Sequence, residues 1–196
     1  SNTVRRRAMA ALGEFLFYSS DQIDSSDQAS MWEIPVSTVN LLNKILNSST
    51  EDDIVKHYAA KTVENIVCKS KAGGAADLFC QPEFIKSFLN LYRTSKNQGI
   101  RNSALVAISA ICTLAPKFIK EVVSKIGVPN LVIQAPDSEK KVQQALLKLL
   151  TLHLMYGERE AMREVIENLG SLLPFLMGFL EHGSMALKGK TLLLFT

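Results

Sequence analysis

The stretch Val4-Arg5-Arg6-Arg7-Ala8-Met9-Ala10-Ala11-Leu12-Gly13-Glu14-Phe15-Leu16 carries the pattern that predicts the fold. A branched apolar residue opens it, a small or apolar residue follows four positions later, and larger apolar residues follow eight and eleven positions later. Residues three or four apart lie on the same side of an α-helix, so this spacing predicts one helical face. Its four positions here are Val4, Ala8, Leu12 and Phe15, which we call the apolar ladder.

The ladder returns four more times along the chain of 196 residues. The later copies are Val55, Ala59, Val63 and Ile66; Ile100, Ala104, Ile108 and Ile111; Val142, Leu146, Leu150 and His153; and Leu187, Thr191 and Phe195. Successive copies begin 51, 45, 42 and 45 residues apart. A helical stripe recurring about every 40–47 residues is typical of armadillo and HEAT repeats. We therefore predict an all-α, right-handed α-solenoid of armadillo/HEAT-like units, about four to five with incomplete ends, as a single domain over residues 1–196.

Capping residues, prolines and glycines divide each repeat into a short, a middle and a long helix, and the long helix carries the ladder. Three helices per repeat favour armadillo over the two-helix HEAT unit. We predict Thr3 and Thr50 as caps of the first two long helices. Ser95 and Gln98 have the spacing of a capping box for the third. Gly127 is predicted to close a short helix.

The first long helix is expected to end near Tyr18. Residues 19–30 are rich in serine and aspartate and are predicted to form a surface loop. Trp32 is expected to anchor this loop to the core, with a binding role as the alternative.

Composition excludes several classes of protein. Hydrophobic residues make up 47% of the chain and charged residues 21%, as in ordinary folded proteins, and no apolar run is long enough to cross a membrane. The three cysteines, Cys68, Cys80 and Cys112, have no metal-binding spacing and are expected to be buried, reduced thiols in a cytoplasmic protein.

No catalytic chemistry is predicted. Among the histidines His57, His153 and His182, none has a carboxylate or cysteine at a spacing typical of a metal site or triad. We expect no catalytic residues, no cofactor, no metal and no small-molecule substrate.

Residues 122–145 resemble the armadillo consensus, with Val128-Pro129-Asn130-Leu131-Val132 like its middle helix and Val142-Gln143-Gln144-Ala145 like the start of its third. Glu64-Asn65-Ile66 is similar to the consensus asparagine-leucine near the end of that third helix. The resemblance implies that the third helices line a groove that binds extended partners.

Residues 4–18 also resemble a stretch in the C-terminal helical region of the Fused and Unc-51-like kinases and pseudokinases, especially the branch of the fourth Unc-51-like member and its plant relatives. This resemblance implies that the chain is the non-kinase tail of a larger protein, a scaffold acting at microtubules, cilia or cytokinetic arrays. The kinase signatures, a Gly-rich loop, His-Arg-Asp and Asp-Phe-Gly, are not found in this sequence.

Positive charge is concentrated in the long helices. The five ladder segments, 4–18, 54–69, 100–115, 139–156 and 185–196, together carry a formal charge of +9, against +3 for the whole chain. We therefore predict a basic groove that binds an acidic or extended protein segment. The candidate partner-binding residues are Arg5, Arg6, Lys56, Lys61, Asn65, Arg101, Lys140, Lys141, Lys148, Lys188 and Lys190.

Two alternatives stay open. The chain is also consistent with a structural or self-associating spacer, because Thr191-Leu192-Leu193-Leu194-Phe195 is an apolar helical segment without a cap. Nucleic-acid binding is the less favoured alternative, because aromatic residues do not alternate with the basic ones.

Overall fold

The computed structural model describes residues 1–25, 34–69, 74–133 and 139–192, and all regular elements in these ranges are helices. The all-α prediction is therefore confirmed. None of the described helices combines the length and the apolar composition that a bilayer span requires. The chain divides into two compact units, Ser1–Leu114 and Ala115–Thr196, and each is described by itself. The single continuous stack over residues 1–196 stays a prediction.

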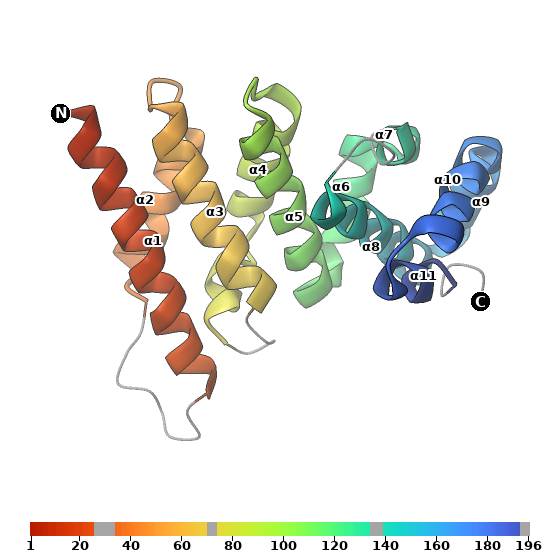
Figure 1. Ribbon diagram of the computed structural model, residues 1–196, viewed down its shortest axis with the longest axis horizontal. Helices are drawn as coiled ribbons and strands as arrows, with labels where there is room; N and C mark the ends of the chain where they lie inside the picture. The colour runs from red at the N-terminus through yellow and green to blue at the C-terminus, as the bar shows by residue number, and fades with distance from the viewer. Residues whose placement is uncertain (26–33, 70–73, 134–138, 193–196) are drawn as a thin grey trace. The chain divides into compact units, whose positions relative to one another are not determined.

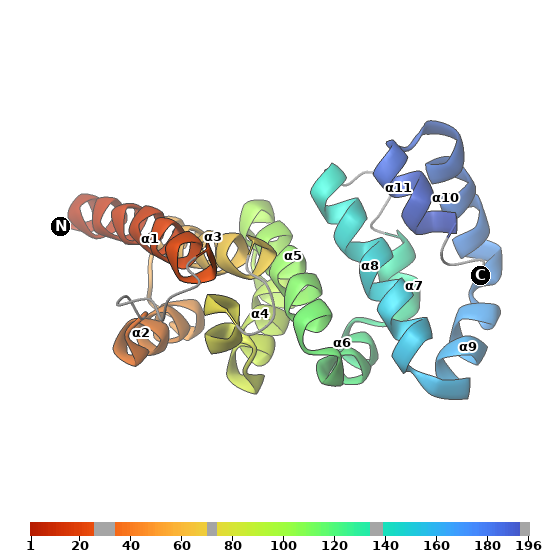
Figure 2. The same ribbon diagram turned by 90° about the horizontal axis from the view of Figure 1, so that it is seen from below.

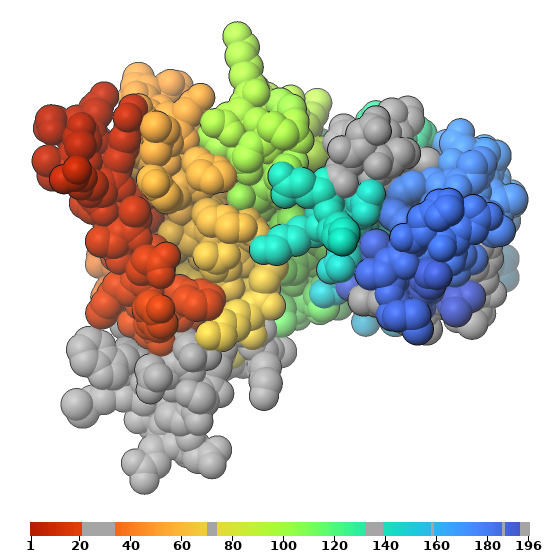
Figure 3. Space-filling model, viewed as in Figure 1, coloured from red at the N-terminus to blue at the C-terminus, as the bar shows by residue number. Residues whose placement is uncertain are grey.

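The N-terminal unit has two layers of helices (Figures 1 and 2). Helices α1, α3 and α5 lie side by side in one layer, and α2 and α4 cover α3 and α5 from behind. In the space-filling view the side chains of α1 directly adjoin those of α3 (Figure 3). The elements of this unit are α1 (Asn2–Ser25), α2 (Val36–Asn47), α3 (Asp53–Lys69), the 3₁₀ helix η1 (Ala75–Phe79), α4 (Pro82–Thr94) and α5 (Gln98–Leu114).

The C-terminal unit is organised around α8, which contacts α6, α7, α9 and α11. Helix α10 packs on α7, α9 and α11 and contains Pro174 in its interior. The turn between α6 and α7 is at Gly127, whose φ of +83° suits glycine, as the sequence predicts. The elements are η2 (Pro116–Phe118), α6 (Ile119–Ile126), α7 (Val128–Ile133), α8 (Lys140–Tyr156), α9 (Glu158–Glu167), α10 (Leu169–His182) and α11 (Met185–Leu192).

The apolar ladder forms the core of the later long helices. Each ladder residue of α3, α5 and α8, and the first two of α11, is buried. In α5 the four positions are at most 1% exposed. Phe195 lies outside the described residues, as do Trp32 and residues 26–30 of the predicted loop.

The ladder prediction for the first helix is wrong. Val4 is 65% exposed and Phe15 is 55% exposed, whereas Met9 and Leu16 are buried. The cause is that α1 contacts α3 through the face of Met9 and Leu16, and no element within the described ranges covers the opposite face. The helix also continues to Ser25, beyond the end expected near Tyr18.

The cysteine prediction is correct only for Cys112. Cys112 is buried, Cys80 is partly exposed and Cys68 is exposed. Cys68 is exposed because it lies in the last turn of α3 on the side away from the ladder. Burial, and next the nearby Cys80, raise the pKa of the Cys112 thiol to about 12.

Helices α1 and α3 approach each other closely at Gly13. A Cβ atom at position 13 would lie 2.5 Å from Thr62 Oγ1 but 3.7 Å from Thr62 Cβ. Thr62 is buried, and its hydroxyl donates a hydrogen bond to the Tyr58 carbonyl at 2.8 Å. Glycine is therefore required at position 13 because a neighbouring hydroxyl occupies the space that a side chain would need.

Gly13→Ala is expected to destabilise the protein by about 1 kcal/mol. Overpacking destabilises a folded protein by roughly 1–3 kcal/mol. Replacing a glycine inside a helix by alanine stabilises the helix by roughly 0.5–1 kcal/mol, which offsets part of this loss. Urea unfolding measures the change, and in a double-mutant cycle Thr62→Ala should remove most of the penalty because it deletes the clashing Oγ1. Gly178→Ala is the control, since a Cβ there meets no atom within 4 Å. An equal penalty with and without Thr62→Ala would contradict the close approach.

Candidate partner-binding surfaces

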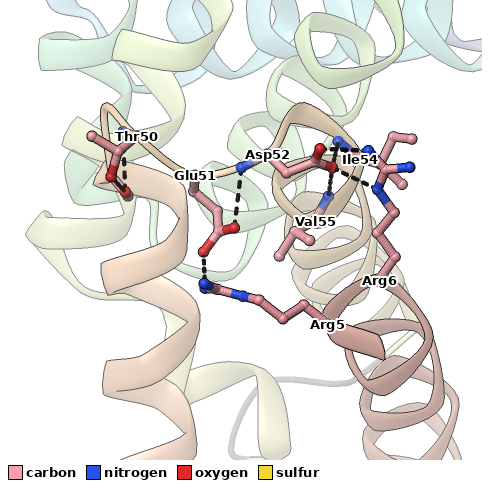
Figure 4. Close-up of polar contacts among 8 residues, drawn as sticks. Arg5, Arg6, Thr50, Glu51, Asp52, Ile54 and Val55 are labelled. Carbon is pink, nitrogen blue, oxygen red and sulfur yellow. Dashed lines mark hydrogen bonds and ion pairs between the residues drawn. The ribbon is translucent and has the colours of Figure 1, made fainter. Parts of the chain in front are cut away.

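The first arginines of the chain bind the acidic start of α3 (Figure 4). Arg6 donates two hydrogen bonds to Asp52, from Nε to Oδ1 at 3.0 Å and from a terminal nitrogen to Oδ2 at 2.6 Å. Arg5 forms an ion pair with Glu51. The two-point geometry matches the planar guanidinium to the carboxylate. Two of the predicted binding residues therefore join α1 to α3.

Asp52 is also the cap of α3. Its Oδ1 accepts hydrogen bonds from the amides of Ile54 at 3.0 Å and Val55 at 3.3 Å. The prediction that Thr50 caps this helix is wrong, because Asp52 directly precedes the first helical residue and occupies the amides that Thr50 would need.

The other capping predictions are also corrected. At α5 the side chain of Asn97 accepts from the Ile100 amide at 3.2 Å, in place of the predicted Ser95–Gln98 box. Asn97 immediately precedes the helix, whereas Ser95 lies two residues before Asn97 and instead accepts from the Asn97 amide. Thr3 lies inside α1, which begins at Asn2.

The arginine–aspartate contact changes the pKa of both partners. The Arg6 hydrogen bonds, assisted by the amides of Ile54 and Val55, hold the pKa of Asp52 below its usual value, against the effect of desolvation. The hydrogen bond with Asp52 raises the pKa of Arg6. Both groups are therefore charged at neutral pH, and their contact is lost only in acid.

Lys61 forms an ion pair with a buried carboxylate. Its Nζ lies 2.6 Å from Glu64 Oε1, and Glu64 is only 3% exposed. The second oxygen of Glu64 is buried and has no hydrogen-bond partner within the described residues. Replacing Lys61 would leave this charge unpaired in the protein interior, which is strongly unfavourable. Lys61 thus has a structural role on α3.

The remaining candidates of the N-terminal unit are differently placed. Arg101 donates to the Ser95 carbonyl at 2.8 Å and to the Gln98 side chain, so it supports the start of α5. Lys56 and Asn65 are half-buried on α3, and neither has a side-chain partner in the described part of the chain.

The candidate partner-binding lysines of the C-terminal unit form fewer polar contacts within the described chain than the arginines of the N-terminal unit. Lys140 and Lys141 are exposed at the start of α8, and Lys188 and Lys190 are half-buried on α11. These four lysines form no ion pair within residues 139–192, and Lys188 Nζ donates a hydrogen bond to the Glu181 carbonyl at 3.3 Å. Lys148, also a candidate, is half-buried in the middle of α8. Because α8 packs on α11, this part of the unit is basic.

A groove of about 540 Å³ lies between α8, α10 and α11. Lys140 lines it from α8, Leu187 from α11, and one side of α10 supplies most of its wall. The α10 residues that line it are Ser171, Pro174, Phe175, Gly178, Phe179 and His182.

The groove was missed from the sequence, although a signal for it exists. Ser171, Pro174, Gly178 and His182 recur at steps of three and four residues, so they lie along one side of a helix. Two of these four residues are a glycine and a proline. A stripe with little side-chain volume beside two phenylalanines indicates a hollow on a helix surface.

One buried histidine has a carboxylate partner that the sequence spacing did not indicate. His153, 6% exposed, places Nε2 at 3.2 Å from Glu164 Oε2 of α9. Its burial was predicted, but the partner comes from the next helix, eleven residues along the chain. The described residues contain no group of three or more histidine, cysteine or acidic side chains able to hold a metal ion.

The Asp52 contact generates a test of pH dependence. The folded-state pKa of Asp52 is lowered, so its stabilisation is fully present above the unfolded pKa near 3.8 and is lost as pH falls through the folded value. Asp52→Asn should therefore lower the melting temperature at pH 7 and flatten its fall below about pH 4. Asp53→Asn is the matched control: it removes the same charge from the same helix end, but Asp53 has no arginine partner in the described structure. Identical melting curves for the two variants at every pH would contradict this role.

Comparisons with known proteins give related chains but no family assignment. No protein-family model matches this chain. The chain is 29% identical over 210 residues to the serine/threonine-protein kinase RUNKEL of Arabidopsis thaliana, covering 97% of this chain and 15% of the relative. It is 26% identical over 158 residues to the serine/threonine-protein kinase ULK4 of Mus musculus, covering 80% of this chain and 12% of the relative. The chain thus spans only a small part of the length of these curated relatives.

One solved structure supports the fold. The crystal structure of an engineered protein superposes with a TM-score of 0.62 at 16% identity, covering 98% of this chain and 89% of that one. At this level of identity the likeness concerns the fold alone. The relation to kinases rests on the two curated relatives, which support a helical region related to the Unc-51-like kinases.

Proposed function

We propose that this chain is a non-enzymatic protein-interaction region of a larger kinase-related protein, and that it binds an acidic or extended segment of a partner. The observation that carries the proposal is the set of lysines on α8 and α11, of which Lys140, Lys141, Lys188 and Lys190 form no ion pair within residues 139–192. Unpaired cations on two packed helices attract acidic chains.

An armadillo-like architecture is part of this proposal. The succession of short, middle and long helices supports it, as does the burial of the ladder at the same positions of α3, α5 and α8. In such a repeat the long helices line the binding surface, and the eleven candidate residues all belong to the long helices. A continuous groove through both units stays a prediction.

The N-terminal unit provides an internal example of this recognition. Arg5 and Arg6 bind the acidic turn of Glu51 and Asp52 within the chain itself. These arginines are therefore partly satisfied, so the C-terminal lysines are the favoured contacts for an external acidic segment.

The proposed cellular context rests on the resemblance of residues 4–18 to the tail of the Unc-51-like kinases, not on the names of the relatives. Both are named serine/threonine-protein kinases, and the chain matches a small part of each. We propose a cytoplasmic regulatory region that carries a microtubule or ciliary partner. The acidic tails of tubulin fit the charge of the lysine surface.

The lysine surface is tested by charge reversal. The double variant Lys140→Glu, Lys141→Glu should weaken binding of a fluorescent oligoglutamate peptide by about tenfold or more, because two attractive charges become repulsive. Fluorescence anisotropy at two salt concentrations measures affinity and its screening. Lys120→Glu with Lys125→Glu is the control, since both lysines are exposed on α6 of the same unit. Equal weakening by the two pairs would contradict a specific surface, and unchanged affinity would contradict the proposal.

Self-association is a second candidate, favoured by an exposed apolar patch on α9 and α10. Its residues, each at least 43% exposed, are Met162, Ile166, Leu169, Leu173 and Met177. Isolated apolar side chains are normal at surfaces, but here they recur every four residues along one side of each helix, which favours an interface.

Sedimentation velocity over a range of concentrations tests this alternative. If the patch joins copies, the wild type forms dimers or larger species at high concentration, and Ile166→Glu with Leu173→Glu remains monomeric. Val36→Glu is the control, since Val36 is 67% exposed on α2, outside the patch. A wild type that is monomeric throughout would exclude self-association as the function of the patch.

A further inference from the structure

The groove between α8, α10 and α11 has a rigid aromatic floor. The rings of Phe175 and Phe179 lie 4.4 Å apart between centroids at an interplanar angle of 66°, an edge-to-face pair. Both are less than a tenth exposed, and Leu187 beside them is 2% exposed. Packing on both sides therefore fixes the floor before any ligand arrives.

The groove is open above Gly178. A Cβ atom at this position would meet no heavy atom within 4 Å, although Gly178 lies between the two turns of α10 that carry Phe175 and Phe179. Glycine costs stability in a helix interior, and here no neighbour requires it for close packing. Its absent side chain leaves space that a ligand group can fill.

The rim of the groove is polar and carries positive charge. Lys140 lines it from the first turn of α8 and forms no ion pair in the described part of the chain. His182 also lines the groove, and the carboxylate of the neighbouring Glu181 lies 3.5 Å from its Nε2. No carboxylate is among the groove-lining residues of the described chain. An apolar floor with a lysine at its edge complements a ligand that is apolar at one end and anionic at the other.

We propose that this groove is an anchor site for a protein segment that places a phenylalanine-like side chain on Phe175 and Phe179 and an adjacent carboxylate on Lys140. Its volume, about 540 Å³, is in the range of sites that enclose small ligands and single anchor side chains. Buried aromatic anchors in preformed pockets supply most of the affinity at many interfaces. The apolar side chain would provide the affinity, and Lys140 would select for the acid beside it.

The inference deepens the proposed function, because it rests on an acidic partner and adds the apolar residue that this partner must carry. The lysine surface alone would accept any acidic chain. The groove adds a requirement of shape, which charge reversal does not test.

The probe is the peptide acetyl-Ser-Phe-Asp-Ser-amide, with Phe→Ala and Asp→Asn versions as its controls. Chemical-shift changes in ¹H–¹³C NMR spectra of the full chain report where it binds and how tightly. We expect the methyl signals of Leu187 to move, and each peptide control to bind at least tenfold more weakly. Gly178→Leu should abolish the changes by filling the groove, and Lys140→Met should remove the preference for the Asp over the Asn peptide.

Gly189→Leu is the matched control for Gly178→Leu. Gly189 lies on α11, away from the groove, and a Cβ there also meets nothing within 4 Å. Circular dichroism checks that each variant folds, and Gly178→Ala supplies a smaller change if Gly178→Leu does not. The anchor-site proposal would be overturned if a folded Gly178→Leu variant bound the peptide as tightly as the wild type. It would also be overturned if Gly189→Leu weakened peptide binding as much as Gly178→Leu does.

The failure of the groove is distinguishable from the failure of the lysine surface. If oligoglutamate binds in a Lys140- and Lys141-dependent manner while the Phe-Asp peptide leaves Leu187 unshifted, the groove is wrong and the proposed function stands. If the peptide binds equally well with Asp or Asn and fills the groove, the anchor role of the phenylalanines stands and the acidic selection is wrong.

Discussion

The close approach of α1 to α3 is the constraint on which the N-terminal unit depends. Gly13 lets the two helices meet at the Thr62 hydroxyl, and the Arg6–Asp52 contact fixes the same pair of helices at the start of α3. Asp52 also caps α3, so one carboxylate both begins a helix and joins it to its neighbour. In this unit, charged residues of the long helices therefore form contacts within the chain, and these contacts compete with binding to a partner.

This use of charge changes which residues can bind an external segment. Arg5, Arg6 and Lys61 each have a carboxylate within the N-terminal unit, and that of Glu64 is buried. In the C-terminal unit Lys140, Lys141, Lys188 and Lys190 form no ion pair within residues 139–192, and an apolar groove lies beside Lys140. Charge would bring an acidic segment to this unit, and the groove would hold one of its side chains in place.

The sequence predicted the helices and most of the core because both follow from local spacing. The ladder is buried in α3, α5 and α8 because each packs against at least two other helices of its own unit. Val4 and Phe15 are exposed because α1 packs mainly against α3. Net charge per helix predicted a basic surface but not its pairing, since Glu51 lies 46 residues from Arg5 in the chain. The groove depends on the missing side chain of Gly178. The sequence shows the stripe on α10 to which Gly178 belongs, but not that residues of α8 and α11 face this stripe. The capping errors arose because Asp52 and Asn97, closer to the helix starts, compete better for the first amides.

The central claim is that an acidic segment binds the lysine-bearing face of α8 and α11. The most direct measurement is an NMR titration of the isotopically labelled chain with oligoglutamate, with amide shifts assigned along the sequence. The account predicts that the largest changes fall at the start of α8 and along α11, and that they shrink as salt is added. Changes concentrated on α2 and α4, or none at concentrations that saturate other basic proteins, would contradict it.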